Sequence, residues 1–262
     1  MRTLWAVIFA GAAMAYLPAR AAAEPARIVV LVSADAEWRA VRGLLPDETV
    51  SPSPFGEWFV KGVESKAGRR PVVFFHGGWG KIAAAGSTQY AIDRWKPERL
   101  VNLGTCGGFA GSTVKGDVVL ADKTVVYDIV ELMGDSTEAI ADYTTDLDVR
   151  GLAEELPKDV RRGPLASADR DLSPVDLERL HKSYGAIAGD WESGAIAWVA
   201  RRNGVPVLIL RGVSDVVGQS GSEAYGNLAA FEEGTRLVMK RLLGDLPFWL
   251  ARLDAARAKS GA

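Results

Sequence analysis

The chain has 262 residues, of which 48% are hydrophobic and 24% are charged, and its formal net charge is −2. That charge argues against general binding to nucleic acid or to an anionic membrane, because both need a surplus of positive side chains. A single cysteine, Cys106, excludes an internal disulfide and a multi-cysteine metal cluster, and two histidines give little basis for a histidine-rich zinc site. We therefore expect neither a metal nor another cofactor.

The N-terminal segment, residues 1–23, has the layout of a secretory signal peptide. Arg2 precedes a long apolar run, which gives way to small residues ending in three consecutive alanines. The alternative is an uncleaved membrane anchor, but the uncharged run 3–19 is at the lower length limit for a spanning helix, and a proline disfavours helix at its end. We expect cleavage, export to the periplasm or beyond, no stable membrane insertion, and a mature domain of residues 24–262.

Downstream, short apolar runs rich in β-branched residues alternate with segments of helical spacing. The pattern predicts, in chain order, a strand at 27–33, a helix at 36–45, strands at 57–63 and 71–76, a helix at 80–95, strands at 99–103 and 117–126, a helix at 174–184, a strand at 186–188, a helix at 192–203, a strand at 206–213 and a helix at 227–243. The polar segment 128–161 is expected to be irregular and to pass over a pocket or an interface. This alternation implies one α/β domain, whose mostly parallel or mixed sheet is covered by helices on both faces.

Polar or glycine-rich residues follow several predicted strands, and ligands bind at such strand ends in open α/β sheets. They occur at 33–37, 77–81, 104–108 and 211–215, and a further group opens a helix at 189–192. Each has a structural explanation when taken singly: the helix dipole favours an acid such as Glu37 in a first turn, and Asp215 can cap the segment after it. However, Glu37, Glu192 and Asp215 all lie at junctions of one sheet, so they can meet in one pocket.

Four stretches of the sequence also occur in an order that is typical of a known family. They are SADAEWRAV (33–41), GGWGKIAAA (77–85), VNLGTCGGFAGSTVKGDVVLADKTVVYD (101–128) and GDWESGAIAWVARRNGVPVLILRGVSD (189–215). Together they resemble the nucleoside phosphorylase/nucleosidase superfamily, in which a Met-Glu pair opens a helix and a later strand ends in R-x-x-S-D. The resemblance covers about residues 27–243 and implies that family's α/β fold.

Within the superfamily, the chain is most similar to the 5′-methylthioadenosine/S-adenosylhomocysteine nucleosidases. Their G-x-G-K-x-x-A-A run is similar to GWGKIAAA, and Glu37 falls where they carry a water-activating glutamate. The resemblance implies that Glu37 is the general base, that Asp215 protonates N7 of the departing purine, and that Glu192 holds the ribose hydroxyls. Such carboxylates suit cleavage of an N-glycosidic bond, because the sugar becomes positive and the base negative, and water must be deprotonated on the opposite ring face.

The same motifs imply further substrate-binding residues. Ser214 would orient the Asp215 carboxyl, and Arg211 would neutralise or position neighbouring acids. The backbone of residues Thr105, Cys106 and Gly107 would lie along the sugar and base, since glycine allows close approach.

Two residues depart from the family pattern. Trp191 stands in place of the methionine before the ribose-binding glutamate, and gives a larger and flatter surface under the sugar. In SADRDL (167–172), Asp171 occupies the position where a purine-stacking phenylalanine is usual. Trp79 or another aromatic residue would then have to supply the stacking.

Three functions are therefore open. The first is metal-free hydrolysis of a purine nucleoside, which the resemblance favours. The second is phosphate-dependent phosphorolysis, in which Glu37 would be an ordinary helix acid and an arginine would hold phosphate. The third is nucleoside binding by an exported protein with little catalysis. The resemblance also implies a homodimer whose partner closes the active site, with contact expected through 128–161.

Overall fold

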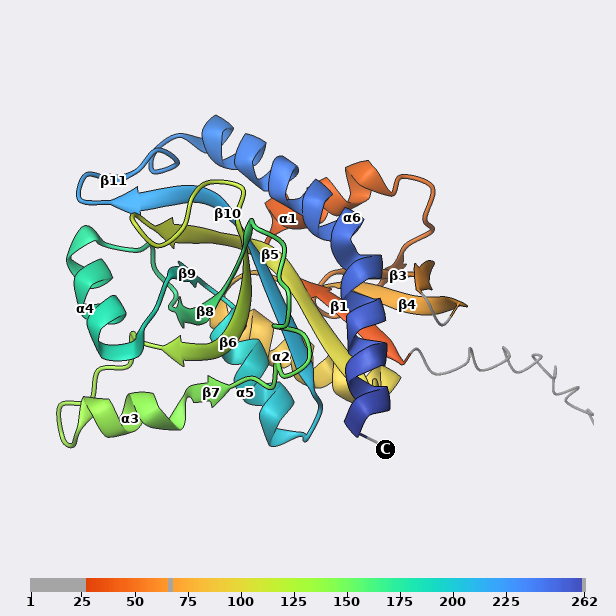
Figure 1. Ribbon diagram of the computed structural model, residues 1–262, viewed down its shortest axis with the longest axis horizontal. Coiled ribbons are helices and arrows are strands. Elements are labelled where there is room, and N and C mark those ends of the chain that lie inside the picture. The colour runs from red at the N-terminus through yellow and green to blue at the C-terminus, as the bar shows by residue number, and fades with distance from the viewer. Residues whose placement is uncertain (1–26, 66–67, 261–262) are drawn as a thin grey trace, which may run out of the picture.

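The computed structural model describes residues 27–65 and 68–260, which form a mixed sheet flanked by helices (Figure 1). The predicted signal peptide, residues 1–23, lies outside the described residues. The strands are β1 (Ile28–Val32), β2 (Ser51–Pro52), β3 (Glu57–Ser65), β4 (Gly68–His76), β5 (Arg99–Phe109), β6 (Val118–Val126), β7 (Thr144–Asp146), β8 (Val160–Ser167), β9 (Ala188–Asp190), β10 (Val207–Gly218) and β11 (Gly221–Ser222). The helices are α1 (Asp35–Leu44), α2 (Gly80–Trp95), α3 (Ser136–Asp142), α4 (Pro174–Tyr184), α5 (Ser193–Arg202) and α6 (Leu228–Ser260).

The strands pair in the order β11-β10-β6-β8-β9-β5-β1-β4-β3-β2, with β7 beside β6. β10 also pairs in parallel with β5, so β5, β10, β6, β8 and β9 close into a ring. β1 connects this ring to the β3–β4 hairpin through parallel pairing with both β5 and β4. Parallel and antiparallel pairs are both present, as the predicted fold class allowed.

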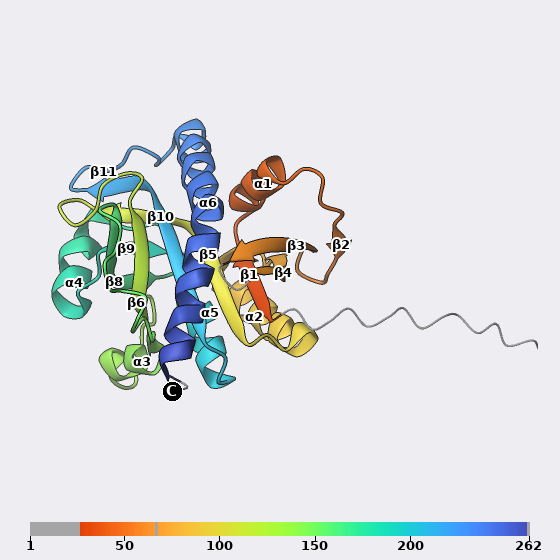
Figure 2. The ribbon, with the colours of Figure 1, turned by 45° about the vertical axis from the view of Figure 1, so that its right-hand side comes forward.

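Two layers of helices bury opposite faces of the sheet. Along β1, Val30 and its alternate neighbours join one hydrophobic cluster, while Val29 and Leu31 join another, because successive strand residues point to opposite faces. α1 and α6 pack together over the first face, and α2 and α5 over the second. Figure 2 shows α6 running down the face of the sheet.

Strands β5 and β10 are longer than the sequence pattern predicts. They continue past the predicted ends at 103 and 213, because each supplies backbone partners to the other as far as the pair Phe109 and Val217. The glycine-rich stretch 104–108 is therefore strand rather than turn. A Cβ on Gly104 would lie 2.2 Å from Arg211 Nη1, so glycine serves close packing there. Asp215 lies within β10, opposite Gly107 and at a shift in register, instead of beyond the strand's end.

Other boundaries also differ. The segment 128–161 contains α3, β7 and the start of β8, where an irregular excursion is predicted. The sequence hides β8, because Gly163 and Pro164 interrupt its apolar pattern, and neighbours on both sides supply its pairing. β9 begins at the last residue of the strand predicted at 186–188.

Helix α6 runs to Ser260 instead of ending at 243, even though it contains Pro247. Proline removes one backbone donor, but Leu246, Trp249 and Leu250 on either side are buried in the core and hold the helix in place. Among the described residues, no helix combines the length and apolar character needed to cross a membrane.

Candidate active site

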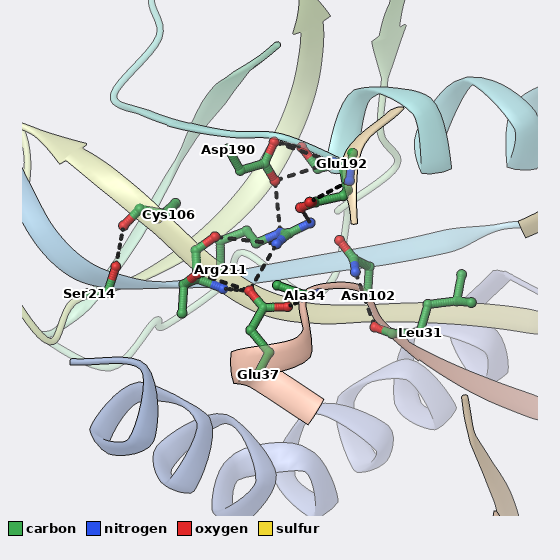
Figure 3. Close-up of polar contacts among 12 residues, drawn as sticks. Leu31, Ala34, Glu37, Asn102, Cys106, Asp190, Glu192, Arg211 and Ser214 are labelled. Carbon is green, nitrogen blue, oxygen red and sulfur yellow. Dashed lines mark hydrogen bonds and ion pairs between the residues drawn. The ribbon is translucent and has the colours of Figure 1, made fainter. Parts of the chain in front are cut away.

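A cavity of about 750 Å³ opens where α1, β5, β9, β10 and the first turn of α6 converge. Every predicted site residue lines the cavity except Arg211, which is fully buried beside two of the lining acids. The lining members are Glu37, Trp79, Thr105, Cys106, Gly107, Asp171, Trp191, Glu192, Ser214 and Asp215. Elements that are distant in sequence thus bring the predicted carboxylates together, as Figure 3 shows for Glu37, Glu192 and their neighbours.

Glu37 is held in the first turn of α1 with its carboxylate pointing into the sheet. Its Oε1 accepts hydrogen bonds from the Thr105 backbone N–H at 2.6 Å and from the Thr105 hydroxyl at 2.9 Å. Its Oε2 accepts from the Ala34 N–H at 3.1 Å. Glu37 is only 1% exposed, so it is a buried carboxylate and not a solvent-facing acid of the helix surface.

Arg211, on β10, contacts a different carboxylate with each of its three side-chain nitrogens. Nε lies 2.8 Å from Asp190 Oδ2 and Nη1 lies 3.6 Å from Glu37 Oε1. Nη2 lies 3.5 Å from Glu192 Oε2. The guanidinium is fully buried; burial works to lower the pKa of Arg211, but the three carboxylates together raise it. One fixed positive charge therefore sits among three acids.

Glu192 is the residue immediately before α5, and it is also buried. Its Oε1 accepts a hydrogen bond of 3.1 Å from the N–H of Gly80, a residue with a positive φ. Burial raises the pKa of Glu192, Arg211 opposes this, and nearby acids add to it. This carboxyl can accept hydrogen bonds from a ligand in the cavity.

Asp215 is held by two serine hydroxyls. Ser214 Oγ donates to Oδ1 at 2.7 Å, and Ser222 Oγ, from β11, donates to Oδ2. Ser214 Oγ also lies 3.4 Å from the Cys106 carbonyl, which contributes through its backbone. Burial raises the pKa of the Cys106 thiol well above its ordinary value, so the thiol stays protonated.

The glycine-bearing part of β5 separates Glu37 from Asp215. A Cβ on Gly104 would lie 2.8 Å from Glu37 Oε1, whereas one on Gly107 would lie 3.9 Å from Asp215 Oδ2. Three residues of strand span about 10 Å. Gly104 itself is not part of the cavity lining, and the two acids border the cavity beside different residues of β5, Glu37 beside Thr105 and Asp215 beside Gly107.

The Asp215 end of the cavity has further polar walls. Leu172 Cδ1 would lie 3.3 Å from a Cβ on Gly107, so residue 172 borders the same place as Asp215. The Tyr225 hydroxyl donates to the Leu172 carbonyl at 2.8 Å. Asp171 also lines the cavity here. The pKa of Tyr225 is raised mainly by burial of its hydroxyl, and the negative charge of Asp171 raises it further.

Trp79 and Trp191 form a stacked pair at the cavity wall, with ring centroids 4.7 Å apart and planes at 27°. Trp79 is 62% exposed. The two tryptophans thus pack on each other.

Sequence reasoning did not single out Asp190, Ser222 or Tyr225 as site residues. Asp190 had a local signal, because it lies two residues before Glu192 in the same turn. Ser222 and Tyr225 lie in the β10–α6 connection, and no pattern in the sequence marks their contacts with Asp215 and Leu172. Within the described part of the chain, no group of three or more His, Cys, Asp or Glu residues is arranged to hold a metal ion.

Several known proteins are similar to this chain. The family model described as "Phosphorylase superfamily" matches residues 27–244. The 5′-methylthioadenosine/S-adenosylhomocysteine nucleosidase of Oceanobacillus iheyensis is 30% identical over 167 residues, which cover 60% of this chain and 73% of that protein. The nucleosidase of the same name from Thermotoga maritima is 31% identical over 159 residues, covering 60% and 72%.

Solved structures of such proteins share the fold. The nucleosidase from Campylobacter jejuni matches with a TM-score of 0.68 and 19% identity, covering 86% of this chain and 99% of that one. The one from S. pneumoniae, solved with the transition-state inhibitor MT-ImmA, matches with a TM-score of 0.67 and 21% identity, covering 86% and 99%.

Proposed function

The chain belongs to the phosphorylase superfamily, and on that premise we propose that it is an enzyme that hydrolyses the N-glycosidic bond of a purine nucleoside. The products are the free base and the sugar. Its relatives are named as methylthioadenosine/adenosylhomocysteine nucleosidases, which supports a nucleoside of that kind as substrate. The observation that carries the proposal is that Glu37 and Asp215 line the same cavity, beside Thr105 and Gly107 of β5 respectively.

In this proposal the base of the nucleoside lies over Gly107 and the ribose over Thr105. Asp215 donates a proton to N7, which relieves the negative charge on the leaving purine. Glu192 binds the ribose hydroxyls, and Glu37 takes a proton from the attacking water. The excess of carboxylates over Arg211 favours the positive charge that develops on the sugar.

The pairing of the arginines supports hydrolysis over phosphorolysis. A phosphate site needs a cation that is free to bind it, preferably an arginine. Of the two arginines lining the cavity, Arg39 lies 3.4 Å from Glu232, and Arg170 pairs with Asp176. Arg211 is already shared among three carboxylates. Each of these cations therefore has an acidic partner.

A free-base release assay in phosphate-free buffer tests the proposal, with adenosine, inosine, methylthioadenosine and adenosylhomocysteine as substrates. We expect release without phosphate, and we expect Glu37→Gln to abolish turnover while substrate still binds in calorimetry. Glu64→Gln, at an acid that is 72% exposed in its side chain, is the matched control and should retain activity. Turnover only with phosphate would identify a phosphorylase, and binding without any turnover would identify a binding protein.

We also propose that the protein is a homodimer. Three apolar side chains in segment 128–161 face solvent, namely Val130, Leu132 and Met133 at 76%, 92% and 98% exposure. Such a cluster is costly to leave in water and is typical of an interface. Light scattering after gel filtration should give twice the chain mass, and Leu132→Glu should give a monomer; a monomeric wild-type protein would contradict this.

Export is a further proposal, supported by the pattern of residues 1–23. The full chain, expressed with a C-terminal tag, should be recovered from the periplasm or medium with a new N-terminus near Glu24. Recovery of the uncleaved chain from the membrane fraction would instead identify an anchor.

A further inference from the structure

The closest ion pair of Arg211 goes to an acid that has no role in the proposed chemistry. Nε lies 2.8 Å from Asp190, whereas the two Nη atoms lie 3.6 Å from Glu37 and 3.5 Å from Glu192. The Asp190 contact is thus the shortest ion pair, although the Nε–H bond is not aligned on that carboxylate as it would be in a hydrogen bond. The guanidinium therefore lies nearest to Asp190, while Nη2 makes a long hydrogen bond to Glu192 and Nη1 donates to the Thr105 carbonyl at 3.3 Å.

Asp190 is itself rigidly fixed. Its Oδ1 accepts a hydrogen bond of 2.8 Å from the Ser193 hydroxyl, and the Ser193 N–H approaches both carboxylate oxygens at 3.3 Å. Its strand, β9, pairs with both β5 and β8. Asp190 is buried, with 8% exposure, and it borders the cavity.

We propose that Asp190 is a positioning residue that retains Arg211 by its Nε and so prevents a close ion pair between the guanidinium and either Glu37 or Glu192. The inference rests on the proposed function, because it concerns how the acids of that site are used. Glu37 and Glu192 then keep lone pairs for water and for ribose hydroxyls. Asp190 also adds a third negative charge, which a buried site transmits to the sugar with little screening.

The consequence is electrostatic. When all three acids are ionised, they outnumber Arg211 and give the cavity floor a net negative charge. A neutral residue at position 190 removes one of these charges and frees Arg211 to approach Glu37 and Glu192. Ligands with a positive sugar ring should therefore lose affinity, while neutral ligands of the same shape should lose much less.

The test compares wild type with Asp190→Asn. Calorimetry would measure two probes that carry the same purine, a protonated pyrrolidine nucleoside analogue and a neutral carbon-linked nucleoside. We expect the variant to weaken the cationic probe at least tenfold more than the neutral one. Asp190→Glu keeps the charge and should keep the wild-type ratio. Glu64→Gln removes a negative charge from an exposed acid outside the cavity lining, so it is the control and should also keep that ratio.

The pH profile gives a second readout. The groups facing Glu192 are Arg211 from β10, Asp190 from β9, Glu37 from α1 and the Gly80 N–H from α2. The charge of Asp190 raises the pKa of Glu192, so its removal should lower that pKa. The acidic limb of kcat/KM would then move to lower pH in Asp190→Asn, which a purely structural role would not cause.

These measurements distinguish failure of the proposed function from failure of the inference about Asp190. If wild type releases no base from any nucleoside, the proposed function is wrong. If wild type is active but Asp190→Asn weakens both probes equally and leaves the pH profile in place, the inference is wrong. Thermal unfolding shows whether the variant is folded, and Asp190→Ser provides a second neutral variant for the same comparison.

Discussion

Asp171 presents a carboxylate at the end of the cavity that we assign to the purine. The nearby aromatic pair, Trp79 and Trp191, is stacked on itself. We expect Asp171→Phe to lower KM for adenine nucleosides roughly tenfold, because stacking of a base on an aromatic ring contributes about 1–3 kcal/mol. Initial rates across a substrate titration measure the change.

Asp171→Asn is the control, because it removes the charge without adding a ring. If both variants lower KM equally, repulsion by the carboxylate is responsible and stacking is not. If neither changes KM, the purine does not reach residue 171, and the assignment of this end to the base is wrong.

At the scale of single residues, the sequence identified side chains that belong to contiguous motifs. Glu37, Glu192 and Asp215 each lie in such a motif, and all three line the cavity. Ser222 could not be found this way, because its contact with Asp215 depends on how β11 folds back on β10. A hydrogen bond between side chains across a turn leaves no periodic pattern in the sequence.

Among the elements, the first turn of α2 is linked by ion pairs and a hydrogen bond to the segments that follow β6 and β8. Lys81 Nζ pairs with Asp128 and lies 4.0 Å from Asp169, and the Lys81 N–H donates to Asp169 at 2.7 Å. This turn also carries the Gly80 N–H that binds Glu192. The ion pairs therefore help to hold one wall of the cavity in position.

We expect Lys81→Met to lower the free energy of unfolding by about 2 kcal/mol, because the substitution leaves Asp128 without its partner. The loss is smaller than for a fully buried ion pair, since the Lys81 side chain is 21% exposed. KM should rise severalfold as the turn loosens around Glu192. Urea unfolding and steady-state kinetics measure the two effects. Lys96→Met, at the exposed end of the same helix, removes a surface pair with Asp93 and should change neither quantity measurably.

A rise in KM with no loss of stability would mean that Lys81 contacts the ligand directly.

The elements themselves were mostly predictable. Strand β1 is a continuous run of apolar, mostly β-branched residues, and helix α4 has an N-cap at Ser173 and a proline in its first turn. Their lengths were not, because β5 and β10 continue through glycines and polar residues only where each pairs with the other.

For the whole molecule, the buried acid Glu192 makes stability depend on pH. Its pKa is raised in the folded protein, so the folded state retains a proton that the unfolded chain releases. The protonated Glu192 therefore contributes to the free energy of unfolding. This contribution is fully present below the pKa of a glutamate in the unfolded chain and is lost as pH rises toward the pKa of Glu192 in the folded protein. The Glu192→Gln variant lacks this titrating group, so the free energy of unfolding of the variant should not fall as pH rises through this range.

We therefore expect the stability of Glu192→Gln relative to wild type to increase between about pH 5 and pH 8, by on the order of 1–2 kcal/mol. Urea unfolding at several pH values measures the difference. Glu64→Gln should follow wild type throughout, because that acid is solvent-exposed. A relative stability that falls with pH would show that Glu192 is better stabilised as an anion than its burial suggests.

The fold class follows from the alternation of apolar strands and helices, but the closure of the sheet into a ring does not. That closure depends on β10 pairing with both β5 and β6, and on β8, whose glycine and proline hide it in the sequence. Strand order is a property of the packed chain, since each of these strands has several partners with similar apolar faces.

The stacked tryptophans at the cavity wall also give the protein an optical signal. Two indole rings with centroids 4.7 Å apart couple their electronic transitions, so Trp79 and Trp191 should contribute a paired positive and negative band to the circular dichroism spectrum. A ligand that inserts against Trp191 would tilt one ring relative to the other and change that band. Occupancy of the cavity can thus be followed without a label and without turnover, even for compounds that the protein binds but does not cleave.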